Sequence, residues 1–187
     1  MPYVWQTDTF IGNWFYDLRA VYKTPKHVAE ILVDVVSKNG NLLLNIPQRP
    51  DGTIDEECRY ILEQMARWIA VNGEGIYGTR PWRLAAEGPS RVATEQQFKE
   101  DPVDWTVDDF RFAAKDKTVY AFQLKWPEGG KATIRSLALG GTERVKDVRL
   151  LGHGKPLPFE QTGQGLEIDL PEEKPSEYVQ CLRIQFA

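Results

Sequence analysis

The run of three leucines at positions 42–44 is the feature that most constrains the fold of this chain. Three consecutive large apolar side chains cannot alternate between a core and solvent. The run therefore predicts a strand covered on both faces, as in the parallel sheets of α/β folds. A buried helix segment would have a similar composition. Gly40 before the run, with Pro47 and Pro50 after it, favours a short strand that ends in a loop.

Helical patterns lie on both sides of this strand. Residues 24–39 carry apolar side chains at helical spacing, with Thr24 as a candidate N-cap and Pro25 in the first turn. Residues 55–72 repeat the pattern, and Asp55 begins them where the helix dipole favours negative charge. A barrel of eight strand–helix units takes about 250 residues. We therefore expect the end of a larger barrel, in which the leucine strand has no parallel partner within this chain.

The apolar period changes to two from about residue 107. Alternating segments flank turn residues such as Asp116, and short strands at this spacing favour an antiparallel β-sandwich. Residues 73–103, which are broken by glycines and prolines, are expected to connect the two parts. The predicted fold class is α/β plus all-β. The terminal portion of a TIM-like barrel occupies residues 1–84, and an antiparallel β-sandwich domain occupies residues 85–187.

Composition excludes several kinds of partner and site. The net charge of −4 gives no reason to expect a nucleic acid or an anionic membrane as a partner. The only histidines are His27 and His153, and no Cys/His spacing fits a metal, so we expect no metal and no cofactor. Cys58 and Cys181 lie in apolar patterns and are expected to be buried thiols. The N-terminus lacks the basic and apolar regions of a signal peptide.

Residues 1–17 are dense in aromatic side chains, among them Trp5 and Trp14, with short polar groups between them. Two interpretations remain open. The segment is either a loop whose aromatic faces stack on sugar rings, or a strand followed by a small aromatic core. Trp105 and Trp126, in the second part of the chain, are likewise either sugar platforms or packing residues.

The loop after the leucine strand is a candidate site because catalytic groups of α/β barrels follow the strands. Asn45, at the strand's end, either projects toward a ligand or holds the following turn. Acid–base chemistry on a sugar needs two facing carboxylates. Asp8 is the candidate in the aromatic segment, and Asp17 is a poorer one.

Five motifs stand out in the first part of the chain: WQTD at 5–8, GNWFY at 12–16, LVDVVSKNGNLLLNI at 32–46, DGTI at 51–54 and NGEGIYGTRPW at 72–82. Together they resemble the C-terminal part of family 29 glycoside hydrolases, the α-L-fucosidases. Residues 108–187 resemble the C-terminal β-sandwich of that family more weakly.

The resemblance implies a retaining reaction with an Asp nucleophile, which lies upstream of the segment represented here, and usually a Glu acid/base. Many members carry Glu after the tryptophan that corresponds to Trp5, whereas this chain has Gln6. An amide cannot donate a proton as a carboxylic acid does. Either Asp8 is the acid/base, or the acid comes from elsewhere in the protein, or this lineage differs from the family. Asp8 is the catalytic candidate, and Trp5, Trp14 and Asn45 are the substrate-binding candidates.

The expected function is that of a C-terminal fragment of an α-L-fucosidase, inactive alone because the strands that carry the nucleophile are absent. The alternative is a non-catalytic carbohydrate-binding or scaffold β-sandwich module. The expected partners are a fucosylated glycan and either a complementing barrel chain or a second copy of this chain. The resemblance implies a secreted, periplasmic or lysosomal location.

Overall fold

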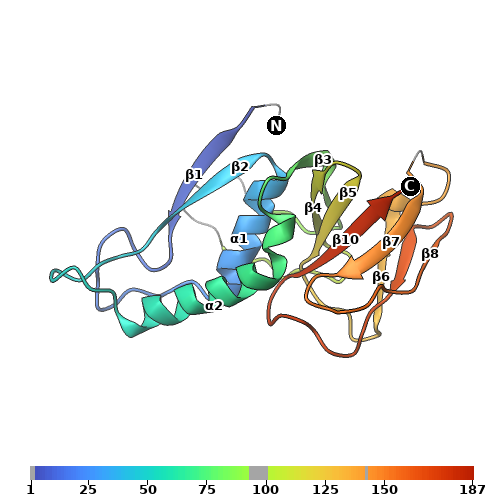
Figure 1. The fold of residues 1–187 in the computed structure, drawn as a ribbon. Coiled ribbons are helices and arrows are strands. Elements are labelled where there is room, and N and C mark those ends of the chain that lie inside the picture. Colours follow the sequence, from blue (N-terminus) through green and yellow to red (C-terminus); the bar gives the residue numbers. More distant parts are fainter. Residues whose placement is uncertain (1–2, 93–100, 142) are drawn as a thin grey trace.

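The computed structural model describes residues 3–92, 101–141 and 143–187. These residues form two helices and three sheets, and β-strands outnumber helices. Figure 1 shows the helices between a two-stranded sheet on one side and a pair of larger sheets on the other.

The first part of the chain alternates strands and helices. Thr24 caps the first helix by accepting a hydrogen bond from the backbone N–H of His27, and Asp55 caps the second through the N–H of Cys58. The elements are β1 (Trp5–Phe10), α1 (Pro25–Ser37), β2 (Gly40–Asn45), α2 (Glu56–Asn72) and the 3₁₀ turn η1 (Gly73–Gly75).

The leucine strand has a parallel partner, so the prediction that it has none is wrong. β2 pairs with β1, with Thr7 opposite Leu42 and Asp8 opposite Leu43. The sequence left a strand at β1 as one of two interpretations because the central residues of β1 are polar, although its β-branched threonines suit a strand.

The strand is also not covered on both faces. Leu43 is 55% exposed, whereas Leu44 packs against the helices. Asp8 and Leu43 thus lie on an open face of the two-stranded sheet, and Thr9 and Leu44 lie on the covered one.

The second part of the chain forms two antiparallel sheets. The strand order is β3–β4–β5–β10–β7 in one and β6–β9–β8 in the other. The strands are β3 (Arg80–Glu87), β4 (Phe110–Lys115), β5 (Thr118–Gln123), β6 (Lys131–Ile134), β7 (Val145–Leu150), β8 (Phe159–Gln161), β9 (Leu166–Asp169) and β10 (Gln180–Phe186). β3 falls in the segment expected to be a connector. The expected junction at residue 84 lies inside it.

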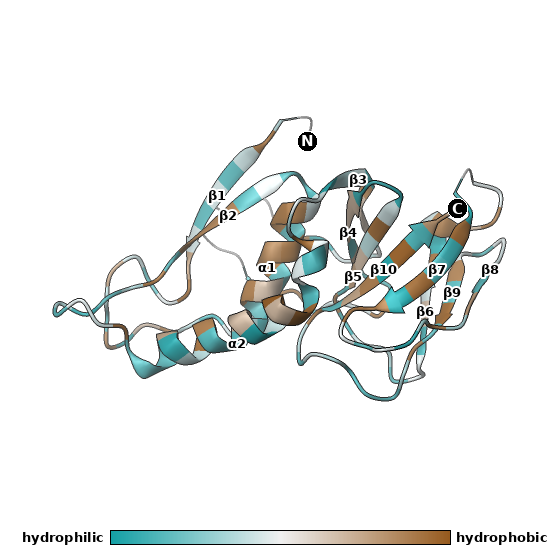
Figure 2. Ribbon diagram, in the orientation of Figure 1, coloured by the Kyte–Doolittle hydropathy of each residue, from teal (hydrophilic) through white to brown (hydrophobic). Residues whose placement is uncertain are grey.

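The five-stranded sheet is buried on both faces. One face shares a core with the three-stranded sheet, in which Phe112 and Ile168 are fully or almost fully buried. The other face packs on the helices, where Phe122 and Trp68 belong to one cluster. Figure 2 shows apolar residues along the central strands of this sheet and on the helices. Because both faces are covered, β4 and β5 are buried almost continuously and do not alternate as the sequence suggests.

Candidate functional site at the carboxyl ends of β1 and β2

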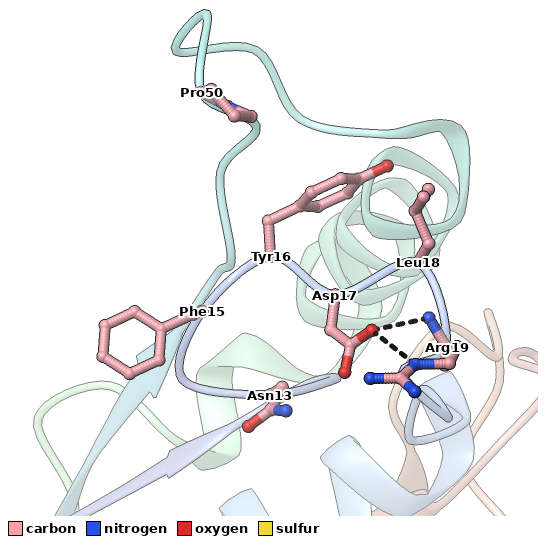
Figure 3. A pocket seen from close by; sticks show the side chains of 7 residues that line it. All are labelled: Asn13, Phe15, Tyr16, Asp17, Leu18, Arg19 and Pro50. Atoms are coloured by element: carbon pink, nitrogen blue, oxygen red, sulfur yellow. Dashed lines mark hydrogen bonds and ion pairs between the residues drawn. The ribbon is translucent and has the colours of Figure 1, made fainter.

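A pocket of about 640 Å³ lies among the loops that follow β1 and β2. Six of its lining residues come from the loop after β1 and one from the loop after β2 (Figure 3). They are Asn13, Phe15, Tyr16, Asp17, Leu18, Arg19 and Pro50. The pocket therefore occupies the edge of the parallel sheet where α/β folds place their ligands.

Asn45 fixes the loop that forms most of this pocket. From the last position of β2, its side-chain amide donates hydrogen bonds to the backbone carbonyls of Asn13 at 3.0 Å and Trp14 at 3.3 Å. The sequence left open whether Asn45 projects toward a ligand or holds the turn that follows β2. In the structure its side chain holds a loop, but this is the loop after β1 and not the turn after β2. Trp14 packs edge-to-face on Phe10, with ring centroids 5.2 Å apart.

The far end of the same loop is tied to the base of α2. The Tyr22 hydroxyl donates to the carboxylate of Asp55 at 2.6 Å, and Asp55 also caps α2. Burial and this hydrogen bond raise the pKa of Tyr22, so it remains a neutral donor. The Lys23 ammonium donates to the carbonyl of Phe10 at 2.9 Å. The end of the loop is thus fixed both to the start of α2 and to the end of β1.

The rim of the pocket carries one charged pair. Asp17 accepts hydrogen bonds from the backbone N–H of Arg19 at 2.9 Å and from its guanidinium at 3.4 Å (Figure 3). Phe15 is 81% exposed. An exposed aromatic ring next to donors and acceptors has the chemistry that recognises a sugar, with C–H groups on the ring face and hydroxyls on the polar groups.

The predicted site residues do not all come together. Trp14 and Asn45 lie in contact beside the pocket. Asp8 lies two residues before the end of β1, on the open face of the sheet. Trp5 is at the opposite end of β1, where its indole N–H donates to the carbonyl of Lys38 at 2.9 Å and its ring lies against Gly40.

Sequence reasoning overlooked part of the pocket lining. Arg19 and Leu18 belong to no motif or periodic pattern, so nothing in the sequence marked them, whereas Pro50 lies in the loop after the leucine strand that was expected to be a candidate site. The aromatic density of residues 1–17 was the signal that pointed to Phe15 and Tyr16. Asp51, by contrast, only closes a turn, since it accepts from the N–H and hydroxyl of Thr53.

Among the residues that the structure describes, no cluster of three or more His, Cys, Asp or Glu side chains could hold a metal ion. No described helix is long and apolar enough to cross a bilayer. Cys58 and Cys181 are both buried and unpaired, as the sequence predicts.

The described residues thus place the carboxyl ends of two parallel strands beside a pocket lined by aromatic and polar side chains, and the helices separate this sheet from the antiparallel sheets. Residues 1–74 match the family described as alpha-L-fucosidase, and residues 103–185 match the alpha-L-fucosidase C-terminal domain. The chain belongs to the α-L-fucosidase family and corresponds to its C-terminal part.

Known relatives agree with this assignment. The plasma alpha-L-fucosidase of Homo sapiens is 36% identical over 180 residues, which are 92% of this chain and 34% of that protein. The tissue alpha-L-fucosidase of Mus musculus is 32% identical over 161 residues, 86% of this chain and 30% of that protein. The chain thus spans about a third of the length of the curated relatives it matches.

Solved structures share the fold. The Thermotoga maritima alpha-fucosidase superposes with a TM-score of 0.79 at 28% identity, over 99% of this chain and 40% of that one. Alpha-L-fucosidase isoenzyme 1 from Paenibacillus thiaminolyticus gives 0.77 at 26% identity, over 100% of this chain and 40% of that one.

Proposed function

We propose that this chain forms the C-terminal part of a retaining α-L-fucosidase that releases L-fucose from glycans. The observation that carries the proposal is the pocket at the carboxyl ends of β1 and β2, in a chain whose two parts both match the family. In this proposal residues 1–84 are the end of a TIM-like barrel and residues 85–187 are a β-sandwich. β3 crosses this boundary, because it already pairs with β4 from Arg80 onward.

In this proposal the open face of β1 and β2 points into the barrel. Gln6, Asp8 and Leu43 are exposed on it, and β1 and β2 form a sheet of only two strands among the described residues. The remaining strands would supply the nucleophile opposite this face. Retaining glycosidases hold their two carboxyl groups about 5 Å apart, and neighbouring strands lie about 4.8 Å apart. A carboxylate on an adjoining strand would therefore face Asp8.

We assign the roles of the site residues accordingly. Asp8 is the acid/base candidate, since Gln6 next to Trp5 cannot donate a proton. Trp14 forms part of the wall around the sugar, and Asn45 holds that wall in place. Trp5 supports the site from a distance, because its ring packs on the helix-facing side of Gly40.

The exposed apolar side chains define the partner in this proposal. Leu43, Phe15 and Leu18 are open to solvent, and such surfaces drive association. The partner is the remainder of the barrel, and a second copy of this chain takes its place when the barrel is absent.

The test is hydrolysis of an aryl α-L-fucoside, measured on this chain alone and on the chain joined behind the preceding barrel strands of a related α-L-fucosidase. We expect turnover only in the joined form. Asp8→Asn should lower its kcat by about 10²–10⁴-fold, whereas the matched Asp17→Asn should retain most of it. Normal turnover by the chain alone would contradict the need for a partner. An unaffected Asp8→Asn enzyme would remove Asp8 as the acid/base.

A further inference from the structure

A second hollow, of about 390 Å³, lies where the start of α1 meets the five-stranded sheet. Segments from four parts of the chain line it: Lys26 on α1, residues 103–105, residues 124–126 after β5, and residues 174–178 before β10. It shares no lining residue with the pocket at the ends of β1 and β2. We refer to it as the α1 groove.

Two aromatic side chains give the α1 groove its apolar surface. Trp126 and Tyr178 are each half-buried, Trp126 against the core between the two antiparallel sheets and Tyr178 against the core on the helix side. The Tyr178 hydroxyl donates to Gln64 at 3.4 Å, which restrains its ring. Both rings are therefore anchored by packing and still reach the groove.

Trp105 lines the same groove but cannot serve as a platform. Its side chain is 4% exposed, and the guanidinium of Arg111 covers its ring at 4.8 Å from the centroid. Of the two interpretations that the sequence leaves open for Trp105 and Trp126, packing holds for Trp105. Trp126 is the ring that remains available.

The charges of the α1 groove cancel. Lys26 pairs with the buried carboxylate of Glu30, and Lys125 lies 3.5 Å from Asp104. The remaining lining charges are Lys174 and Glu177, one of each sign and both exposed. A groove with balanced charge does not attract an anion or a cation selectively. It offers ammonium donors and carboxylate acceptors side by side.

We propose that the α1 groove is an accessory binding site for a neutral saccharide of one or two rings. Pyranose C–H groups would stack on Trp126, because the face of an aromatic ring is electron-rich. Hydroxyl groups would accept from Lys174 and Lys125 and donate to Glu177 and Asp104. The volume fits such a ligand, because small-molecule sites begin at roughly 300 Å³. This function is independent of hydrolysis and would hold a glycan away from the pocket at the ends of β1 and β2.

The experiment is calorimetric and tryptophan-fluorescence titration of the full chain with lactose as the neutral probe and 3′-sialyllactose as the anionic one. We expect saturable lactose binding in the millimolar range. Trp126→Ala and Lys174→Ser should each weaken it about tenfold or more. Lys155→Ser, which changes an exposed lysine outside the groove, should leave it unchanged. Thermal unfolding of each variant checks that the fold is retained, and Lys174→Ser carries the test if Trp126→Ala is unstable.

Three results would overturn the proposal. One is the absence of saturable lactose binding up to about 50 mM. Another is binding that survives both groove variants but is lost in Phe15→Ala, which would place the sugar in the other pocket. The third is binding of 3′-sialyllactose about tenfold tighter than lactose, since a groove of balanced charge gives no such preference. Failure of fucoside hydrolysis would not affect this proposal, because the titration measures binding alone.

Discussion

The guanidinium Nε of Arg111 lies 2.5 Å from Oδ1 of Asp34, and this ion pair joins β4 to α1 across the core. The Arg111 side chain is 3% exposed. The second carboxylate oxygen of Asp34 accepts from Lys38 at 2.6 Å, and Arg111 covers the ring of Trp105. The helices and the five-stranded sheet are thus joined by a buried charge as well as by apolar packing.

Replacement of Arg111 by Met should destabilise the protein by about 3 kcal/mol, because Asp34 would keep a charge with one partner lost. Urea unfolding followed by tryptophan fluorescence measures this loss. The double variant with Asp34→Leu should recover part of it, since no charge then remains buried. Arg83→Met, which breaks an exposed pair with Glu143, should cost less than about 1 kcal/mol. Equal losses in the two single variants would contradict this account.

Replacement of Asn45 by Leu should loosen the loop that lines the pocket. Two backbone carbonyls would lose their donor, at a cost of about 0.5–1.5 kcal/mol. Limited proteolysis within residues 13–21 should become faster by roughly 2–13-fold. Asn41→Leu, an exposed change on the same strand, is the matched control and should be cleaved at the original rate. A protected loop in the Asn45 variant would show that the amide is dispensable.

Asp109 should contribute to the acid sensitivity of the fold. Its side chain is fully buried. Burial alone would raise its pKa, but hydrogen bonds from Ser90 and Thr106 outweigh burial and lower the pKa. The unfolded chain therefore binds this proton more readily than the folded one. The stabilisation is present above the unfolded pKa of about 3.9 and is lost as the pH falls through the folded value.

Replacement of Asp109 by Asn should therefore cost about 1.5–3 kcal/mol at neutral pH and flatten the loss of stability below about pH 5. Denaturant unfolding over a pH series measures both effects. Asp108→Asn, at the exposed neighbouring position, should keep the slope of the unaltered protein. An unchanged acid slope in the Asp109 variant would contradict the assignment.

Leu43 should control the self-association of this chain. Its side chain is exposed opposite Asp8 on the neighbouring strand, so Leu43→Lys removes an apolar contact and adds a favourable cross-strand pair. Size-exclusion chromatography with light scattering should show a shift toward monomer. Leu139→Lys, at a position of similar exposure in the second part, should elute like the unaltered chain. If the unaltered chain is monomeric, the open face of β1 and β2 does not drive self-association and the proposal is contradicted.

Local signals predicted the helices and most of the antiparallel strands. Thr24 and Asp55 mark the helix starts because capping chemistry is local to a few residues. The turn around Asp116, which has a positive φ of 53°, was equally visible. β1 was recognised as a strand only in one of two interpretations, and its pairing with β2 was missed because register depends on tertiary contacts. β3 was missed because Pro81 and the neighbouring glycines suggested a connector.

The candidate site was less predictable. Trp14 and Asn45 were named from position and type, and they do meet, but their contact depends on a loop that crosses from one strand to its neighbour. The sequence could not show that Trp5 begins β1 and so lies at the end of that strand opposite the pocket. It also could not reveal the α1 groove, because that groove joins four segments that are distant along the chain.

The core on the helix side joins residues from both halves of the molecule, with Trp68 of α2 donating its indole N–H to the carbonyl of Val179 at 2.7 Å. If recombination moved the antiparallel sheets into another protein without α1 and α2, the helix-side face of the five-stranded sheet would be exposed to solvent. We therefore expect α1 and α2 to be inherited together with the antiparallel sheets.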